Sequence, residues 1–409
     1  MRIAIVGGGI GGLALALGLH QRGIPCDVYE GVPEVKELGV GITLLPHAVR
    51  ELAALGVQPQ LEALGIENLE SVFFNRWGQF IYREPRGRHA GYGVPEIGMH
   101  RGKLHGVLYQ AAVERLGAQH VHLGHRCTGV QQEGGQVTLG FSDPQGRARE
   151  PVRADLVVAC DGVNSTVRRQ FYPGEQPAFA GINTWRGVTV HPPILTGKTY
   201  MRIGSIDTGK MVVYPIVDDV DGRGNQLVNW TAEIRRAESG MNDWNKPGRL
   251  EDFLPVYREW KFDWLDVPRL IATASEILEY PMVDKDPVPQ WTFGRVTLLG
   301  DAAHPMYPRG SNGSAQALID ASTLAGLLAE GGDPAAALRR YEAVRLPATA
   351  KVVETNRTVP PDFIIMKADA LSGGRPFPGS IDDLVSQEEL QRISDDYKRV
   401  AGFALEKAK

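Results

Sequence analysis

Three glycines near the amino terminus have the spacing of a dinucleotide-binding turn. Gly7, Gly9 and Gly12 directly follow the apolar run at residues 2–6 and precede a run of small apolar residues that predicts a helix. In a βαβ unit such glycines permit a tight turn, close approach of the backbone to a pyrophosphate, and close packing of the helix, whose N-terminus offers free N–H groups. Glu30 ends the next expected strand, where an acid typically binds a ribose hydroxyl. The pattern predicts a dinucleotide site, with a purely structural glycine turn as the alternative, and does not distinguish NAD from FAD.

Two aspartates each follow an expected buried strand and point to FAD. Asp161 comes after the run DLVVAC, and Asp301 comes after the run RVTLL. Doubly wound sheets bind ligands at the carboxyl ends of their parallel strands. Asp301 can accept hydrogen bonds from ribityl hydroxyls, and the helix expected from about Ser314 can direct its N-terminus at a flavin and stabilise negative charge on the reduced ring.

The order of the motifs resembles the class A flavoprotein aromatic hydroxylases, the group of p-hydroxybenzoate and salicylate hydroxylases. The segments that carry the resemblance are GGGIGG, HRGKL at 100–104, CDGVNSTVR at 160–168 and GDAAHPMYPRGSNG at 300–313. It spans about residues 1–350 and is strongest toward phenazine-hydroxylating members, through segments such as TWRGVT, YPI and VNW. The chain departs from many members at Ala315, where they carry asparagine, so ring contacts cannot be transferred in detail.

The expected fold is α/β. The resemblance implies a Rossmann-like FAD-binding domain of the glutathione-reductase type, an inserted and mostly antiparallel β-sheet substrate domain, and C-terminal helices. Alternating stretches such as TWRGVTV, MVVYPIV and QLVNWTAEI favour the antiparallel sheet. We predict a discontinuous FAD-binding domain at 1–71, 99–180 and 281–345. The substrate domain is predicted at 72–98 and 181–280, and a C-terminal helical segment at 346–409.

The expected helices near the carboxyl end have recognisable signals. Asp333 is a good N-cap for a helix that begins at Pro334, and Pro347 is expected to kink or break that helix. Ser386 and Glu389 have the spacing of a capping box for a final amphipathic helix.

The resemblance also implies a reaction. FAD would be the cofactor and NADH or NADPH the co-substrate, and O2 would hydroxylate an electron-rich aromatic or heteroaromatic acid through a flavin C4a-hydroperoxide, with accompanying decarboxylation left open. The implied cofactor-binding residues are Gly7, Gly9, Ile10, Gly11, Gly12, Glu30, Val40, Gly41, Arg101, Asp161, Gly162, Gly300, Asp301, Pro308, Gly310, Ser311, Asn312 and Gly313. The flavin ring of this family moves between an exposed and a buried position, and we expect room for it beside Gly39, Gly41, Gly310 and Gly313.

Residues that act on the substrate are harder to identify. Tyr214, in the run MVVYPIV, is a candidate for orienting the aromatic ring, and His47 is a candidate acid or base near neutral pH. Packing roles for both residues remain open, and His304 is expected to be structural. The predicted chemistry requires no metal, and none is predicted.

Composition narrows the class of protein. The formal net charge of −4 at pH 7 argues against nucleic acid as a partner. Three widely spaced cysteines fit a reducing compartment, and the absence of a long apolar run predicts no transmembrane helix, so we expect a cytoplasmic enzyme. A homodimer is possible. Another flavin oxidoreductase, such as an oxidase or reductase, and a non-catalytic flavin sensor remain alternatives, and the identity of the aromatic substrate is open.

Overall fold

The computed structural model describes the chain except for residues 38, 237–245 and 406–409. Its first layer is a six-stranded sheet in the order β21-β22-β12-β1-β2-β8, in which the strands run parallel apart from β21 at one edge. The strands are β1 (Ile3–Val6), β2 (Cys26–Tyr29), β8 (Val121–His122), β12 (Leu156–Ala159), β21 (Thr292–Phe293) and β22 (Val296–Leu298). Every residue of β1 and β12 is buried, because both faces of the sheet are covered.

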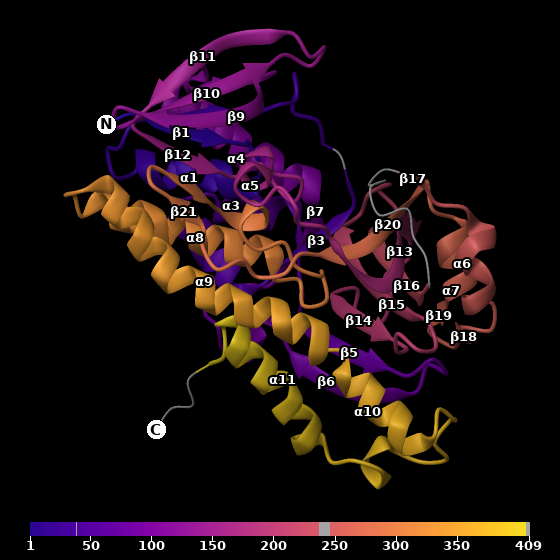
Figure 1. The fold of residues 1–409 in the computed structure, drawn as a ribbon. Coiled ribbons are helices and arrows are strands. Elements are labelled where there is room, and N and C mark those ends of the chain that lie inside the picture. Colours follow the sequence, from indigo (N-terminus) through magenta and orange to yellow (C-terminus); the bar gives the residue numbers. More distant parts are fainter. Residues whose placement is uncertain (38, 237–245, 406–409) are drawn as a thin grey trace.

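Helices cover one face of this sheet and a β-meander covers the other (Figure 1). The helices are α1 (Ile10–His20), α4 (Arg101–Leu116) and α8 (Gly313–Ala329), and the meander consists of β9 (Arg126–Glu133), β10 (Gln136–Ser142) and β11 (Ala148–Ala154). The first βαβ unit and the two later strands therefore form where the sequence predicts them.

The second layer is an eight-stranded sheet in the order β17-β20-β13-β16-β15-β14-β5-β6. Its strands are β5 (Glu70–Phe74), β6 (Phe80–Pro85), β13 (Ala178–His191), β14 (Thr199–Ile203), β15 (Lys210–Val217), β16 (Gln226–Arg235), β17 (Lys246–Pro247) and β20 (Glu276–Asp284). The pairing is antiparallel except between β14 and β5. Trp185 and Trp230 pack with Phe253 in its core, beneath α6 (Leu250–Tyr257) and α7 (Val267–Ala272). The antiparallel second sheet is confirmed.

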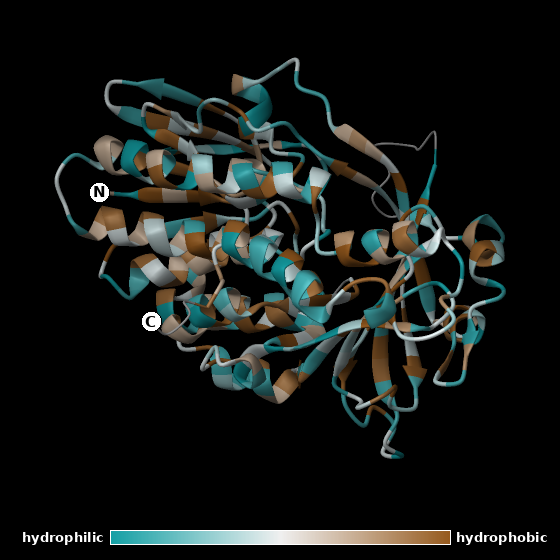
Figure 2. Ribbon diagram, turned by 90° about the horizontal axis from the view of Figure 1, so that it is seen from below, coloured by the Kyte–Doolittle hydropathy of each residue, from teal (hydrophilic) through white to brown (hydrophobic). Residues whose placement is uncertain are grey.

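The two sheets differ in hydropathy pattern. In Figure 2 the strand that begins at the N-terminus is apolar along its length, whereas strands of the second sheet carry both apolar and hydrophilic residues. Continuous apolar runs suit strands that are buried on both faces, and alternation suits strands that turn one face to a different environment. In this protein that second environment includes a cavity between the two layers.

A small sheet in the order β3-β7-β4 joins the layers. It consists of β3 (Gly41–Leu44), β4 (Ile66–Glu67) and β7 (Ile97–His100). Residues 72–98 were expected in the second sheet, and β5 and β6 confirm most of this, but β7 belongs to the small sheet. Gly98 lies directly against β15, since a Cβ there would be 2.7 Å from the Pro215 carbonyl oxygen.

The C-terminal segment is helical, with one correction. Asp333 caps α9 (Pro334–Thr358), which continues through Pro347, so the expected break is wrong and the kink stays a prediction. Arg345 and Thr349 on either side of the proline are buried, and packing of this helix against α8 outweighs the lost backbone hydrogen bond. The predicted boundary at residue 345 lies inside this helix.

The last two helices are α10 (Phe363–Ser372) and α11 (Gln387–Ala401). Ser386 caps α11 as predicted, but the Glu389 carboxylate pairs with Lys367, and the reciprocal capping box lies instead at Ser380 and Asp383. Within the described part of the chain, none of the helices has the length and apolarity needed to cross a membrane.

Candidate active site

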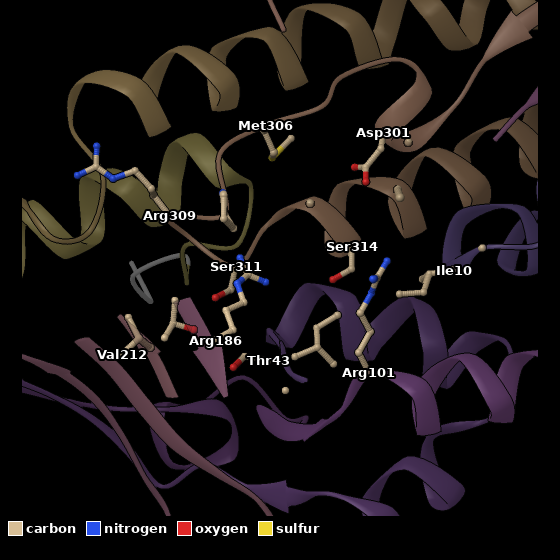
Figure 3. A pocket seen from close by; sticks show the side chains of 18 of the residues that line it. Ile10, Thr43, Arg101, Arg186, Val212, Asp301, Met306, Arg309, Ser311 and Ser314 are labelled. Carbon is tan, nitrogen blue, oxygen red and sulfur yellow. The ribbon is translucent and has the colours of Figure 1, made fainter. Parts of the chain in front are cut away.

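A cavity of about 380 Å³ lies between the two layers, and we call it the central cavity (Figure 3). One side is formed by the turns that follow β1, β12 and β22, and the opposite side by β14, β15 and β16. A second hollow of about 310 Å³, the side hollow, adjoins it. The two share the lining residues Gly41, Arg101, Arg186, Asp301, Met306 and Pro308.

The glycine turn after β1 has two different kinds of glycine. Gly7 has a φ of +104°, and a Cβ there would lie 2.4 Å from the Cys160 carbonyl oxygen, while a Cβ at Gly12 would lie 2.0 Å from the Gly7 carbonyl oxygen. A Cβ at Gly9 would have no other heavy atom of the described chain within 4 Å. Gly7 and Gly12 are therefore needed by the fold, whereas Gly9 leaves open space at the N-terminus of α1, which no side chain of the described residues caps.

Glu30 is engaged in holding this turn. Its Oε2 accepts a hydrogen bond from the Gly8 amide at 2.7 Å, and its Oε1 accepts one from the Val32 amide at 2.9 Å. His105 on α4 donates to the Gly8 carbonyl oxygen at 2.6 Å from the opposite side. Glu30 is not among the residues that line the central cavity, so a ribose contact stays a prediction.

Two opposite charges face the cavity without partners. The Asp301 carboxylate and the Arg101 guanidinium both line it, and neither forms an ion pair or side-chain hydrogen bond with a described residue. The N-terminus of α8 also faces it through Gly313 and Ser314, again without a side-chain cap among the described residues. Figure 3 shows Asp301, Arg101 and Ser314 on the same side as Ile10. Two helix N-termini and a cation suit phosphate and carbonyl oxygens, and a free carboxylate suits hydroxyl groups. These residues fit an FAD molecule.

The turn that carries Asp301 is fixed by hydrogen bonds to the buried Asp320, a residue that the sequence analysis did not identify. The Asp320 carboxylate accepts hydrogen bonds from the Gly300 amide at 3.2 Å, from His304 Nε2 at 2.6 Å and from Arg345 Nε at 2.7 Å. Its side chain is buried in the apolar run ALIDAS, and a lone acid there was the available signal. His304 is a structural residue of this turn, as expected.

The motif at 160–168 acts as a scaffold. The Asp161 carboxylate accepts from Ser165 Oγ at 2.5 Å and from the Thr166 amide at 2.8 Å, at the start of α5 (Thr166–Phe171). Its neighbours Cys160 and Gly162 line the central cavity. Arg168 donates to the carbonyl oxygens of Ala302 and Ala303, at 3.0 and 2.6 Å. The Asp161 side chain therefore orders α5, and Arg168 joins this motif to the turn at Asp301.

The loop before α8 lines the cavity in part. Pro308, Ser311 and Gly313 line it, whereas Gly310 and Asn312 do not. A Cβ at Gly310 would lie 1.5 Å from the Tyr397 hydroxyl, so Gly310 allows α11 to approach. The expectation that Gly310 gives a ring room to move is wrong. At Gly41 a Cβ would lie 2.6 Å from the Asn229 side chain, but Gly41 does line the cavity, so room for a ring beside it stays a prediction.

His47 lies outside the cavity and is corrected to a packing residue. Its Nε2 forms a hydrogen bond of 2.9 Å with Asn312 Oδ1, and its ring stacks on Phe403 with centroids 4.6 Å apart. Asn312 in turn donates to the Tyr397 hydroxyl at 2.9 Å. Burial lowers the pKa of His47 to about 4, so the imidazole is neutral at ordinary pH. The contact instead fixes α2 (Pro46–Ala54) to the loop before α8.

Tyr214 lines the cavity as expected. It stacks on Tyr200, with ring centroids 5.0 Å apart and planes at 17°, and the two rings form an aromatic wall on β14 and β15. The Tyr200 hydroxyl lies 3.5 Å from Ser311 Oγ. Burial raises the pKa of Tyr214 far above its ordinary value, so its hydroxyl stays protonated. Thr43, whose buried Oγ1 has no hydrogen-bond partner among the described residues, also lines this part of the cavity.

Beyond the aromatic wall lies a group of charged side chains that sequence reasoning missed. Its members, which we call the charged cluster, are Arg202, Lys210, Glu233, Arg309 and Asp362. They come from β14, β15, β16, the loop before α8 and the residue before α10. Most alternate with apolar residues in strands, which made them resemble the exposed face of a sheet. Among the described residues, no group of three or more His, Cys, Asp or Glu side chains is placed to hold a metal ion.

Comparison with known proteins decides the family. The model of the FAD binding domain family matches residues 1–244 and 268–356. The chain belongs to this family. It is 40% identical over 361 residues to the phenazine 1,6-dicarboxylic acid hydroxylase PhzS of Lysobacter antibioticus, covering 87% of this chain and 89% of that protein. It is 31% identical over 361 residues to the 6-hydroxynicotinate 3-monooxygenase of Pseudomonas fluorescens, covering 86% and 89%.

Solved structures of known proteins have a similar fold. The 2,6-dihydroxypyridine-3-hydroxylase of Arthrobacter nicotinovorans has a TM-score of 0.72 at 26% identity and covers 92% of this chain and 94% of its own. Klebsiella pneumoniae HpxO, in complex with FAD and uric acid, has a TM-score of 0.72 at 24% identity and covers 99% and 93%. This family member is an FAD-dependent aromatic monooxygenase, so the ambiguity between NAD and FAD in the glycine motif is resolved for FAD.

Proposed function

We propose that this monooxygenase hydroxylates a fused-ring or bicyclic aromatic acid of the phenazine carboxylate kind. One observation carries the proposal: a single cavity has unpaired flavin-type contacts on one side and an aromatic wall that leads to charged side chains on the other. The 40% identity to a phenazine dicarboxylic acid hydroxylase supports a ring system larger than benzene. NADH and NADPH remain equal candidates for the reductant, and the location in the cytoplasm and a homodimer stay predictions.

In this proposal the cofactor lies along the turns after β1 and β22. Gly9 and the N-terminus of α1 hold the pyrophosphate, Asp301 holds ribityl hydroxyls, and Arg101 neutralises nearby negative charge. Pro308, Ser311, Gly313 and the N-terminus of α8 would border the isoalloxazine. When bound, FAD supplies the two-electron chemistry and the activation of O2.

The chain's own contribution to the reaction is to orient the substrate and exclude water. Tyr214, whose ring is backed by the stacked ring of Tyr200, provides an aromatic contact for the substrate ring. Because its pKa is raised, Tyr214 acts as a neutral hydrogen-bonding group and not as a base. Thr43 offers a second hydroxyl from β3. The substrate carries its own electron-rich ring, so no protein nucleophile is required.

The test is turnover of the FAD-loaded enzyme. Phenazine-1-carboxylate, phenazine-1,6-dicarboxylate, quinoline carboxylates and hydroxybenzoates are each added with NADH or NADPH in air, and both nicotinamide oxidation and product mass are followed. The proposal expects one fused-ring acid to stimulate oxidation at least about tenfold and to gain oxygen. Stimulated oxidation that yields peroxide alone with every acid indicates an oxidase with an aromatic effector. A flavoprotein that no nicotinamide reduces indicates a sensor.

A further inference from the structure

The charged cluster lies at one end of the central cavity, on the far side of the aromatic wall from the flavin contacts. Figure 3 shows Arg309 and Val212 on one side of the cavity and Asp301, Arg101 and Ile10 on the other. Tyr214 lines the same cavity, on the same strand as Val212 and Lys210. An aromatic ligand that spans this cavity therefore has one end toward the residues around Asp301 and the other toward the cluster.

Asp362 is at the centre of the cluster. Its Oδ2 lies 2.7 Å from Lys210 Nζ and 3.8 Å from Arg309 Nε, and its Oδ1 lies 3.8 Å from Arg202 Nε. Lys210 also donates to Glu233 Oε2 at 2.9 Å. Burial alone would raise the pKa of Asp362, but the three cations lower it below its usual value, so the carboxylate is ionised.

The charges of the cluster do not balance. Three cations face two carboxylates, so the described residues of this cavity end carry one uncompensated positive charge. The side chains of Lys210 and Arg202 are only 2% and 6% exposed, and that of Arg309 is 9% exposed. An unbalanced charge that is shielded from water is costly unless an anion joins it.

Donor groups in the cluster are also unused. Arg309 Nε is buried and has no hydrogen-bond partner among the described residues, because its contact with Asp362 is too long for a hydrogen bond. Arg202 has one guanidinium nitrogen on Ser71 Oγ at 2.7 Å, and its plane lies over the Tyr200 ring at 4.5 Å. A planar carboxylate matches such guanidinium groups in shape and charge.

Resting on the proposed function, we propose that Arg309, Arg202 and Lys210 bind one carboxylate of the aromatic substrate, and that Asp362 limits this end of the cavity to a single negative charge. The substrate's acid group lies in the cluster, its ring lies against Tyr214, and the ring edge away from that acid faces the flavin. Asp362 is a positioning residue, because it holds the three cations together and leaves one charge for the ligand.

The test measures binding to the oxidised, FAD-loaded enzyme, so it does not require turnover. Phenazine-1-carboxylate is compared with phenazine-1-carboxamide, and 3-hydroxybenzoate with 3-hydroxybenzamide, by the change in flavin absorbance. The wild type is expected to prefer the acid by about tenfold or more. Arg309→Met should lose about tenfold in affinity for the acid while the amide changes by less than about threefold, and Arg309→Lys, which restores the charge but not the planar guanidinium, should recover only part of the preference.

Asp362→Asn distinguishes an anion site from a structural ion network. It keeps the shape and raises the net charge of the cluster, so the preference for the acid should increase about threefold or more, opposite to Arg309→Met. A structural network predicts instead that both variants weaken acid and amide equally. Arg357→Met is the matched control, because Arg357 pairs with Asp284 and Asp286 and does not line the cavity. Its acid-to-amide ratio should equal that of the wild type.

The outcomes separate this inference from the proposed function. If aromatic acids are bound and hydroxylated but the acid-to-amide ratio does not respond to Arg309→Met and Asp362→Asn, the carboxylate assignment is wrong and the hydroxylase remains. If no aromatic acid perturbs the flavin and none is hydroxylated, the proposed function and this inference fail together. Flavin content and near-ultraviolet circular dichroism of each variant show that the protein compared is folded holoenzyme.

Discussion

Asp320 Oδ2 accepts a hydrogen bond of 2.6 Å from His304 Nε2, directly beneath the turn that carries Asp301. The same carboxylate binds the Gly300 amide and Arg345, so one buried acid joins that turn, α8 and α9. The charge of Asp320 is balanced by groups that never touch the cavity. The position of Asp301, the proposed flavin contact, therefore depends on residues outside the site.

We expect Asp320→Asn to lower both FAD retention and stability. The amide cannot accept all three hydrogen bonds, and Arg345 is left buried without its anion, which typically costs a few kcal/mol. FAD affinity should fall at least about tenfold, and the melting temperature of the apoprotein should fall as well. The control is Asp333→Asn, because asparagine is also a good N-cap and should leave both quantities near wild type. Normal flavin content in Asp320→Asn would contradict the scaffold role.

Asp301→Ala should lower FAD binding without lowering the stability of the apoprotein. The Asp301 carboxylate has no partner among the described residues, so its removal leaves no group of the chain unpaired. We expect the apoprotein to melt at the wild-type temperature, while FAD binding weakens strongly because ribityl hydroxyls lose their acceptor. Measuring FAD affinity by fluorescence and apoprotein melting by circular dichroism separates the two effects. Full flavin occupancy after purification would mean that Asp301 does not hold the cofactor.

Substitution of the two kinds of glycine in the first turn should have different effects, one on FAD binding and the other on folding. Gly9→Val has free space for its side chain, so the protein should fold and yet lose FAD, because the added atoms occupy the place of the pyrophosphate. Gly7→Val should not fold well, since its φ of +104° and the nearby Cys160 carbonyl exclude a branched side chain. Circular dichroism and flavin content of the two variants give the comparison. A folded Gly9→Val protein that keeps FAD would place the pyrophosphate elsewhere.

His47 predicts a pH dependence of stability. Its folded-state pKa of about 4 lies below the ordinary value of about 6.5, so between these values the unfolded chain binds a proton that the native chain does not. This contribution makes the protein less stable as the pH falls from about 6.5 toward 4, by up to about 3 kcal/mol. His47→Gln keeps a donor for Asn312 and removes the titration. Urea unfolding at pH 7.5 and 5.5 should show a smaller loss for His47→Gln than for the wild type, and equal losses would contradict the assignment.

The parts of the fold that were predicted correctly are those specified by residues close together in the chain. The glycine turn, the strands before Asp161 and Asp301, and the helix from Arg101 depend on residues that are neighbours in the chain. The error at Pro347 has a different cause, because the burial that sustains α9 comes from tertiary packing against α8 and α11 and not from the residues around the proline. A single sequence contains no direct signal for such contacts.

The site residues divide in the same way, because those that belong to a local motif were predicted and those that meet through tertiary contacts were not. Motif residues such as Gly9 and Asp301 lie in the cavity because the motif itself builds the turn. The charged cluster escaped detection because Lys210 and Glu233 meet through strand pairing and Asp362 reaches them from beyond α9. His47 stands near a motif in sequence yet packs against Phe403, in the segment after α11, so proximity along the chain was misleading there.

The last prediction concerns the place where the central cavity and the side hollow meet, which we call the passage. The central cavity and the side hollow share Arg186 and Met306, and Arg186 lies over the Tyr280 ring at 5.5 Å. Gly39 and Gly313 leave space beside this passage, since an added Cβ at either would meet no heavy atom closer than 3.9 Å among the described residues. Met306 is flexible enough to adapt to either arrangement. A ring system held at this place therefore has two adjacent volumes available.

We expect an aromatic acid to accelerate reduction of the bound FAD by NADH or NADPH at least about tenfold, because a flavin reduced without substrate would waste nicotinamide. Anaerobic stopped-flow absorbance with and without phenazine-1-carboxylate measures this directly. Met306→Ala widens the passage and should raise the rate without the acid, so the stimulation becomes smaller, whereas Met366→Ala, outside both hollows, should keep the wild-type ratio. Equal reduction rates with and without every aromatic acid would overturn the gating prediction and leave the FAD site intact. Stimulation that is identical in Met306→Ala would instead place the moving element away from this passage.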